Sequence, residues 1–160
     1  MEAWGGERHC LALPFFYIME RILAIDYGRR RIGLARNDAL GFTAHGLPTL
    51  IVRNRENAIV QVLEVIEKEQ PDRIVVGLPR NLDGSMSDMT EVVDVFVEQL
   101  QDRMSLPIVK IDERLTSVAA LKTMRDMGIK QKGNKGTVDK MAAVYLLEIY
   151  LQQQATRVSD

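Results

Sequence analysis

Apolar residues recur along the chain at two spacings, which predict a β-hairpin followed by alternating helices and strands. Short, continuous apolar runs are typical of strands covered on both faces of a sheet. They occupy 22–25, 32–36, 48–52, 73–79 and 107–111. Apolar positions three and four residues apart indicate helices packed on one side, and they occupy 56–70, 89–100, 118–127 and 138–149. This order predicts an α/β protein, a mixed sheet with helices packed on its faces.

Threonine residues are predicted to cap the two helices near the C-terminus. Thr116 is expected to cap the helix over 118–127, and Thr137 to cap the last helix after a basic loop over 129–136. Asp139 would then fall in the first turn of the last helix. The apolar stripe expected for this helix is Val138, Met141, Ala142, Tyr145, Leu146 and Ile149.

The length of 160 residues suits one well-buried core and is too short for two domains of ordinary size. We expect residues 19–155 to form a single domain. Residues 1–18 would be an N-terminal leader or tail outside it, and residues 156–160 a C-terminal tail. The apolar run at 11–18 is far shorter than the ~20 residues of a membrane span, so no membrane partner is expected.

Composition restricts the chemistry. The net charge of −1 provides no overall attraction to nucleic acid, so any binding must come from local patches. The single cysteine, Cys10, excludes an internal disulfide framework, and the two histidines, His9 and His45, leave no Cys/His set for zinc. These counts favour a reducing cytoplasm and a metal held by oxygen ligands.

Three carboxylates lie where predicted elements begin or end. Asp26 ends the first strand, Glu113 follows the last strand, and Asp139 opens the last helix. A fold can gather such acids around hard divalent cations, which prefer oxygen ligands. Two such ions can activate water and neutralise charge during phosphodiester hydrolysis. We therefore predict a metal-dependent nuclease in which all three acids are catalytic residues and metal ligands, with Asp26 bridging both ions.

Each acid also has an ordinary structural explanation. Asp26 could cap a turn before Gly28, and Glu113 could pair with a basic neighbour at the surface. Asp139 would be favoured in the first turn of a helix by the helix dipole. The set of three therefore carries more weight than any one member.

Glycine and basic residues flank the acids in the sequence. Gly28 would let the backbone approach a phosphate, or it would simply form a tight hairpin turn. Arg29, Arg31, Lys135 and Lys140 could contact a nucleic-acid backbone, or they could form a solvated face.

Four groups of residues, in this order along the chain, carry a resemblance to a known family. They are 24–28 with 31–35, 76–79 with 82–84, 112–117, and 135–143. Together they resemble the YqgF family of ribonuclease H-like proteins, relatives of the RuvC resolvases, over nearly all of 21–152. The departures are Asn37-Asp38, where many members have Ser before Asp, and residues 1–18, which have no counterpart.

This resemblance implies a ribonuclease H-like fold, with a five-stranded mixed sheet flanked by helices, and a cytoplasmic hydrolase that uses Mg²⁺ or Mn²⁺. Family members are named as nucleases of pre-16S rRNA, acting in 5′-end maturation, and as Holliday junction resolvases. By motif match, the family's acids fall on Asp26, Glu113 and Asp139. Asp83, Arg114 and Lys135 would support the site or contact the substrate.

Three classes of function stay open. The first is an endonuclease for the 5′ end of pre-16S rRNA in ribosome biogenesis, with branched DNA in recombination and repair as the alternative substrate. The second is an ATPase or sugar kinase of the actin-like group, which also has Asp-x-Gly after a strand but closes two domains around its nucleotide. The third is a non-catalytic RNA-binding assembly factor, against which the intact acids argue. The expected partners are structured RNA, with branched DNA as the alternative, and the ribosome or its assembly factors.

Overall fold

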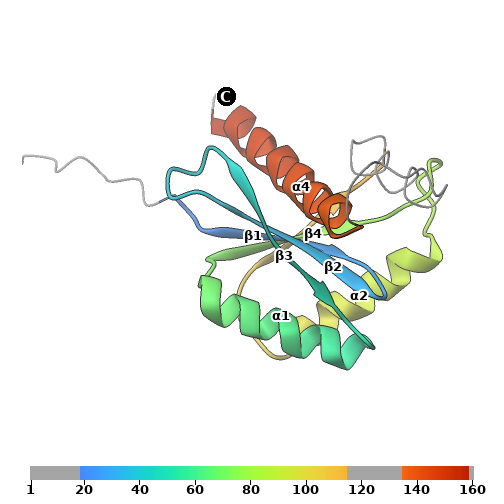
Figure 1. Cartoon of the computed structure of the whole chain (residues 1–160). Helices are drawn as coiled ribbons and strands as arrows, with labels where there is room; N and C mark the ends of the chain where they lie inside the picture. Colours follow the sequence, from blue (N-terminus) through green and yellow to red (C-terminus); the bar gives the residue numbers. More distant parts are fainter. Residues whose placement is uncertain (1–18, 115–134, 159–160) are drawn as a thin grey trace, which may run out of the picture.

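A five-stranded sheet with helices on both faces forms the protein in the computed structural model, which describes residues 19–114 and 135–158 (Figure 1). The strand order is β3-β2-β1-β4-β5. The elements are β1 Ile22–Tyr27, β2 Arg31–Asn37, β3 Ala44–Ile51, α1 Arg55–Glu69, β4 Arg73–Leu78, α2 Asp88–Gln101, β5 Ile108–Asp112 and α4 Lys135–Val158.

The sheet is mixed, as predicted. β1 pairs antiparallel with β2 and parallel with β4, and β3 and β5 form the edges. The predicted strand at 48–52 is too short at its start, since β3 begins at Ala44. Its first residues include Ala44 and Gly46, and both residue types are depleted in strands. Pro48 is accommodated because β3 is an edge strand and its pairing with β2 shifts register between Ile32 and Leu34.

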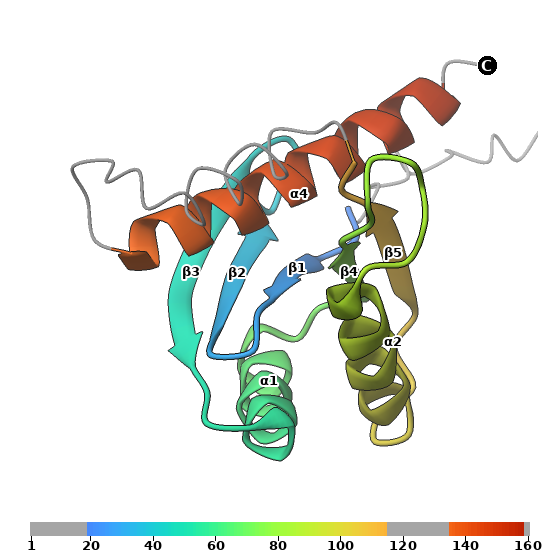
Figure 2. The same ribbon diagram turned by 90° about the vertical axis from the view of Figure 1, so that its right-hand side faces the viewer.

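Two apolar layers, one on each face of the sheet, explain the continuous apolar runs. Leu23 and Ile25 of β1 pack on the side of α1 and α2, and Ile22 and Ala24 pack on the side of α4. Figure 2 shows α4 lying across one face with α1 and α2 on the other. Because side chains alternate along a strand, even-numbered residues of β1 face α4.

The last helix differs from its prediction in two ways. α4 begins at Lys135, so residues 135 and 136 belong to the helix and not to the predicted loop. Thr137 therefore lies inside the helix rather than capping it, and Asp139 lies beyond the first turn. Helix ends predicted from local signals are commonly displaced by one or two residues. The helix predicted over 118–127 and its cap Thr116 lie outside the described residues.

The buried face of α4 is also rotated from the predicted stripe. The buried residues are Asp139, Ala142, Ala143, Leu146, Leu147 and Tyr150. Val138, Met141, Tyr145 and Ile149 are only partly buried. The helix is apolar over much of its circumference, so periodicity allowed two overlapping stripes. In the structure, the buried stripe is the one that places the small alanines against the sheet. Neither α4 nor any other described helix is long and apolar enough to cross a membrane.

The helices α1 and α2 follow their predictions closely. α1 ends at Glu69, where Gln70 adopts a left-handed conformation with φ 50° before Pro71. α2 starts with a capping box, in which the Ser87 backbone N–H donates to Thr90 Oγ1 over 2.9 Å. The Thr90 hydroxyl also donates to the Pro79 carbonyl just after β4. This buried residue therefore joins the start of α2 to the end of β4.

Replacing Thr90 with valine tests that connection. Thr90→Val keeps the shape but removes the hydroxyl, so the Ser87 N–H and the Pro79 carbonyl lose a partner. We expect the free energy of unfolding to fall by about 1–3 kcal/mol, measured by urea denaturation. Thr156→Val, at an exposed position of α4, is the matched control and should change stability by less than about 0.5 kcal/mol. Equal effects of the two variants would contradict this role.

Candidate active site

The site is centred on Asp26, near the carboxyl end of the central strand β1. Asp26 is 4% exposed and follows Ala24 on the face covered by α4. In the sheet it lies between two glycines. Gly33 of β2 is its partner, and Gly77 of β4 is beside it because Ile25 is opposite Val76. The row Gly33–Asp26–Gly77 leaves the positions on both sides of the carboxylate without side chains.

The two glycines make room for the other two acids. A Cβ at Gly33 would overlap the backbone oxygen of Asp139, and a Cβ at Gly77 would overlap Oε1 of Glu113. The start of α4 therefore approaches the sheet on one side of Asp26, and the Glu113 side chain lies over it on the other. Adjacent strands are only about 4.8 Å apart. The structure thus brings together three acids that are 87 and 26 residues apart in the sequence.

Sequence reasoning missed the purpose of Gly33 and Gly77. A signal was present, because glycine inside a strand often marks a close approach of backbone or ligand. The identity of the approaching group depends on a residue far along the chain, and the local sequence does not reveal it.

All three carboxylates are buried, with exposures of 4% for Asp26, 3% for Glu113 and 2% for Asp139. One oxygen of each, Asp26 Oδ1, Glu113 Oε1 and Asp139 Oδ2, makes no hydrogen bond, although each residue has interactions of its own. Burying several like charges is unfavourable unless cations compensate them. In kind, this donor set suits a hard divalent ion.

The acids do not form a closed metal cage as they stand. Within 19–114 and 135–158, no group of three or more Asp, Glu, His or Cys side chains is arranged to hold a metal ion. Instead, Arg31 Nη1 lies 3.7 Å from Asp139 Oδ2 and supplies positive charge from the chain itself. The three acids thus provide suitable oxygen donors, but their side chains are not arranged around one ion position.

A local ion pair joins Asp112, the last residue of β5, to Arg114. The Arg114 backbone N–H and Nε donate to the two Asp112 carboxylate oxygens over 2.9 and 2.8 Å, and this lowers the pKa of Asp112. The Arg114 guanidinium also lies against Gly84, whose φ of +87° suits glycine. Arg114 therefore joins the end of β5, beside Glu113, to the turn after β4. Sequence reasoning assigned no role to Asp112, although two residues of separation in an extended chain places both on one face.

Asp83 has a structural function in the turn after β4. Its carboxylate accepts hydrogen bonds from the Ser85 N–H and hydroxyl over 2.8 and 2.6 Å, which lowers the pKa of Asp83. The nearby Arg114 charge acts in the same direction. Asp83 thus orders the turn that Arg114 contacts.

The candidate nucleic-acid contacts lie at different places around the site. Gly28 sits in the β1–β2 turn, where an added Cβ would lie 2.5 Å from the Arg31 carbonyl oxygen. Arg29 points toward α2, with Nε 3.4 Å from the Met89 sulfur. Arg31, the first residue of β2 after this turn, reaches Asp139. The side chain of Lys135 lies outside the described residues.

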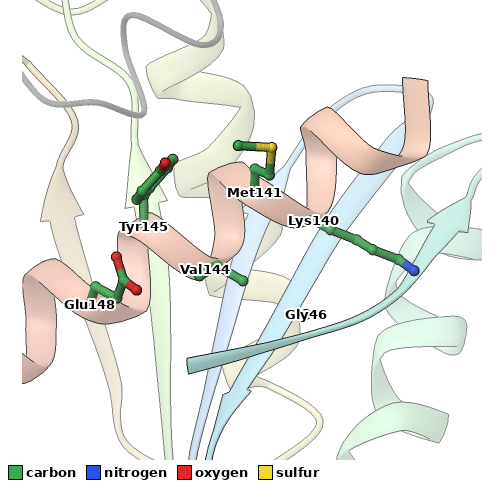
Figure 3. Close-up of a pocket in the computed structure, with 6 residues that line it drawn as sticks. All are labelled: Gly46, Lys140, Met141, Val144, Tyr145 and Glu148. Carbon is green, nitrogen blue, oxygen red and sulfur yellow. The ribbon is translucent and has the colours of Figure 1, made fainter. Parts of the chain in front are cut away.

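Lys140 lies on the flank of α4 rather than among the acids. It extends from α4 along β3, and its Cβ is 3.3 Å from the position of a Cβ on Gly46 (Figure 3). It borders an open hollow of about 430 Å³. The residues lining this hollow are Gly46, Lys140, Met141, Val144, Tyr145 and Glu148. Asp139 is on the buried face of the same helix, so the hollow and the acids are on different sides of α4.

Comparison with known proteins identifies the family of this chain. The RuvX family, whose description is Holliday junction resolvase, matches residues 20–153. The chain belongs to the RuvX family. This is the YqgF family of the sequence resemblance, which is therefore confirmed.

Curated relatives of this RuvX chain share about two fifths of its residues. A protein of Clostridium acetobutylicum is 43% identical over 131 residues, covering 82% of this chain and 97% of the relative. A protein of Acetivibrio thermocellus is 42% identical over 136 residues, covering 84% and 96%. Both are named "Putative pre-16S rRNA nuclease".

A solved structure confirms the ribonuclease H-like fold of this RuvX chain. Thermus thermophilus RuvC, solved in complex with a Holliday junction substrate, aligns with a TM-score of 0.53 and 16% identity. The alignment covers 86% of this chain and 98% of RuvC. At this identity the likeness concerns the fold alone.

The close approach at Gly33 can be tested by adding one methyl group. Gly33→Ala would push the backbone of α4 away from β2, and we expect a loss of about 1–3 kcal/mol in the free energy of unfolding by urea denaturation. Gly46→Ala on β3 is the matched control, because its new Cβ would meet side-chain atoms of Lys140 and Val144 at 3.3 Å or more and no backbone atom within 4 Å is among its nearest neighbours. If both variants are equally stable, α4 does not depend on Gly33 for its position.

Proposed function

We propose that this protein is a metal-dependent endonuclease that hydrolyses phosphodiester bonds in structured nucleic acid, most directly in 5′-end processing of pre-16S rRNA during ribosome biogenesis. The observation that carries this proposal is the burial of Asp26, Glu113 and Asp139 beside the row Gly33–Asp26–Gly77 in a chain of the RuvX family. Buried carboxylates favour cations nearby and offer oxygen ligands.

Asp26, Glu113 and Asp139 would hold Mg²⁺ or Mn²⁺. A divalent ion there would supply a lowered pKa for a bound water and charge neutralisation for the phosphoryl oxygens. The chain itself supplies rigid placement, since Asp26 is on the central strand and Asp139 is on a helix packed tightly on β2. It also keeps the acids away from bulk water, which strengthens their electrostatic interactions.

Basic residues around the acids would contact the substrate backbone. Arg114 is held by Asp112 next to Glu113, and its planar guanidinium suits a phosphate. Gly28 and Arg29 lie in the turn between β1 and β2, Arg31 begins β2, and Lys135 and Lys140 lie in the first two turns of α4. Phosphate contacts of this kind position a nucleic acid without reading its sequence.

The choice of RNA as the first substrate rests on the names of the curated relatives. The family's own description, Holliday junction resolvase, favours branched DNA as the second candidate. If pre-16S rRNA is the substrate, we expect a cytoplasmic location and contact with the ribosome or its assembly factors. A non-catalytic RNA-binding factor is the alternative from another class, and the three intact acids argue against it.

The first test is cleavage by Asp26→Asn. This change removes a carboxylate charge with almost no change in volume, so cleavage with Mg²⁺ or Mn²⁺ should fall at least about a hundredfold while the fold is kept. The assay uses a labelled precursor-rRNA 5′-leader fragment and a four-way DNA junction, each with metal or chelator. Asp102→Asn, at the exposed far end of α2, is the matched control and should cleave like the wild type. Wild-type activity in Asp26→Asn would refute the proposal.

Metal binding should also stabilise the fold. Ligands that bind only the folded state raise its stability, by about 2.7 kcal/mol at a concentration one hundred times the Kd. We expect Mg²⁺ or Mn²⁺ to raise the Tm of the wild type, and Asp26→Asn to lose most of that rise. Potassium chloride at matched ionic strength controls for screening. An equal rise with potassium would show that no specific site is occupied.

A further inference from the structure

The ion pair between Arg31 and Asp139 places a cation of the chain itself at the candidate metal site. Arg31 Nη1 lies 3.7 Å from Asp139 Oδ2, and the side chains are 37% and 3% exposed. A carboxylate as buried as Asp139 is costly without positive charge nearby. Arg31 provides that charge from a side chain that still reaches solvent.

The fold directs Arg31 toward the acids. It is the first residue of β2, two positions before Gly33, so both face the side of the sheet that α4 covers. The backbone of Asp139 lies directly over Gly33. The same close packing that positions Asp139 beside Asp26 therefore also brings it within reach of Arg31.

The geometry of the pair suits a reversible contact. A separation of 3.7 Å is longer than a charge-assisted hydrogen bond, which is about 2.7–2.9 Å. The interaction is thus mainly electrostatic, and another cation can replace it without breaking a hydrogen bond to this oxygen. By contrast, Arg114 makes two hydrogen bonds to Asp112 and is fixed.

We propose that Arg31 is a positioning residue that acts as a built-in counter-ion for Asp139 in the metal-free protein and is displaced when a divalent metal binds. Arg31 therefore stabilises the empty site and competes with the metal. This inference rests on the proposed function, because it takes the three acids as metal ligands. It assigns Arg31 a role in addition to the substrate contact proposed above.

The experiment measures Mn²⁺ binding without nucleic acid, by titration calorimetry and by electron paramagnetic resonance of the free ion. Arg31→Gln should lower the Kd for Mn²⁺ at least about fivefold, as expected when a competing interaction is removed. Arg30→Gln is the matched control, since it removes the same charge from the exposed residue directly before Arg31. Its Kd should stay within about twofold of the wild type, because solvent and salt screen an exposed charge. Arg31→Lys keeps the charge and should retain the wild-type Kd.

Thermal unfolding provides a second measurement that a merely structural role would not reproduce. Arg31→Gln should lower the Tm of the metal-free protein, but at saturating Mn²⁺ its Tm should equal that of the wild type, since the pair is already broken there. A deficit of the same size with and without Mn²⁺ would mean that Arg31 is a permanent structural partner, which overturns the inference.

The remaining outcomes separate the inference from the proposed function. If Arg31→Gln binds Mn²⁺ more weakly, or if Arg31→Gln and Arg30→Gln change the Kd for Mn²⁺ equally, Arg31 does not compete with the metal. Either result leaves the proposed metal-dependent nuclease intact. Absence of specific Mn²⁺ binding by the wild type overturns both.

Discussion

Close contact between the sheet and the groups that cover Gly33 and Gly77 is the constraint on which the site depends. At Gly33 the backbone of α4 approaches β2, and at Gly77 the Glu113 carboxylate lies over β4. Both contacts occur directly beside Asp26. The small residues Ala142 and Ala143 extend the close packing along α4. A larger side chain at either glycine would separate the acids, so the site exists only while this packing is kept.

The same packing creates an electrostatic conflict that the rest of the fold must offset. Three buried carboxylates repel one another, and proteins commonly carry such unfavourable arrangements at functional sites. Here two apolar layers, one on each face of the sheet, supply the compensating stability. Arg31 reduces the conflict locally through its ion pair with Asp139. Burial of these acids thus favours cations nearby, which connects the architecture with the proposed metal-dependent hydrolysis.

The surroundings of the acids divide into fixed and adjustable parts. Arg114 is bound by Asp112 and lies against the turn that Asp83 orders, so this side is rigid before any substrate arrives. Arg31 is held by a longer contact on the other side. Rigid placement of ligands lowers the reorganisation that a reaction needs. A site of this form fits the family of nucleases and resolvases to which the chain belongs.

The sequence by itself determined most elements and the mixed sheet, because strand and helix periodicity is local. It also singled out the three acids as candidates, because the motifs around them are contiguous. It could not decide which stripe of α4 is buried, since that helix is apolar over much of its surface. It also left open what Gly33 and Gly77 accommodate, and that Arg31 rather than Arg29 reaches an acid. These features depend on contacts between residues far apart in the chain. Only the packing of α4 and β5 with the rest of the sheet decides them.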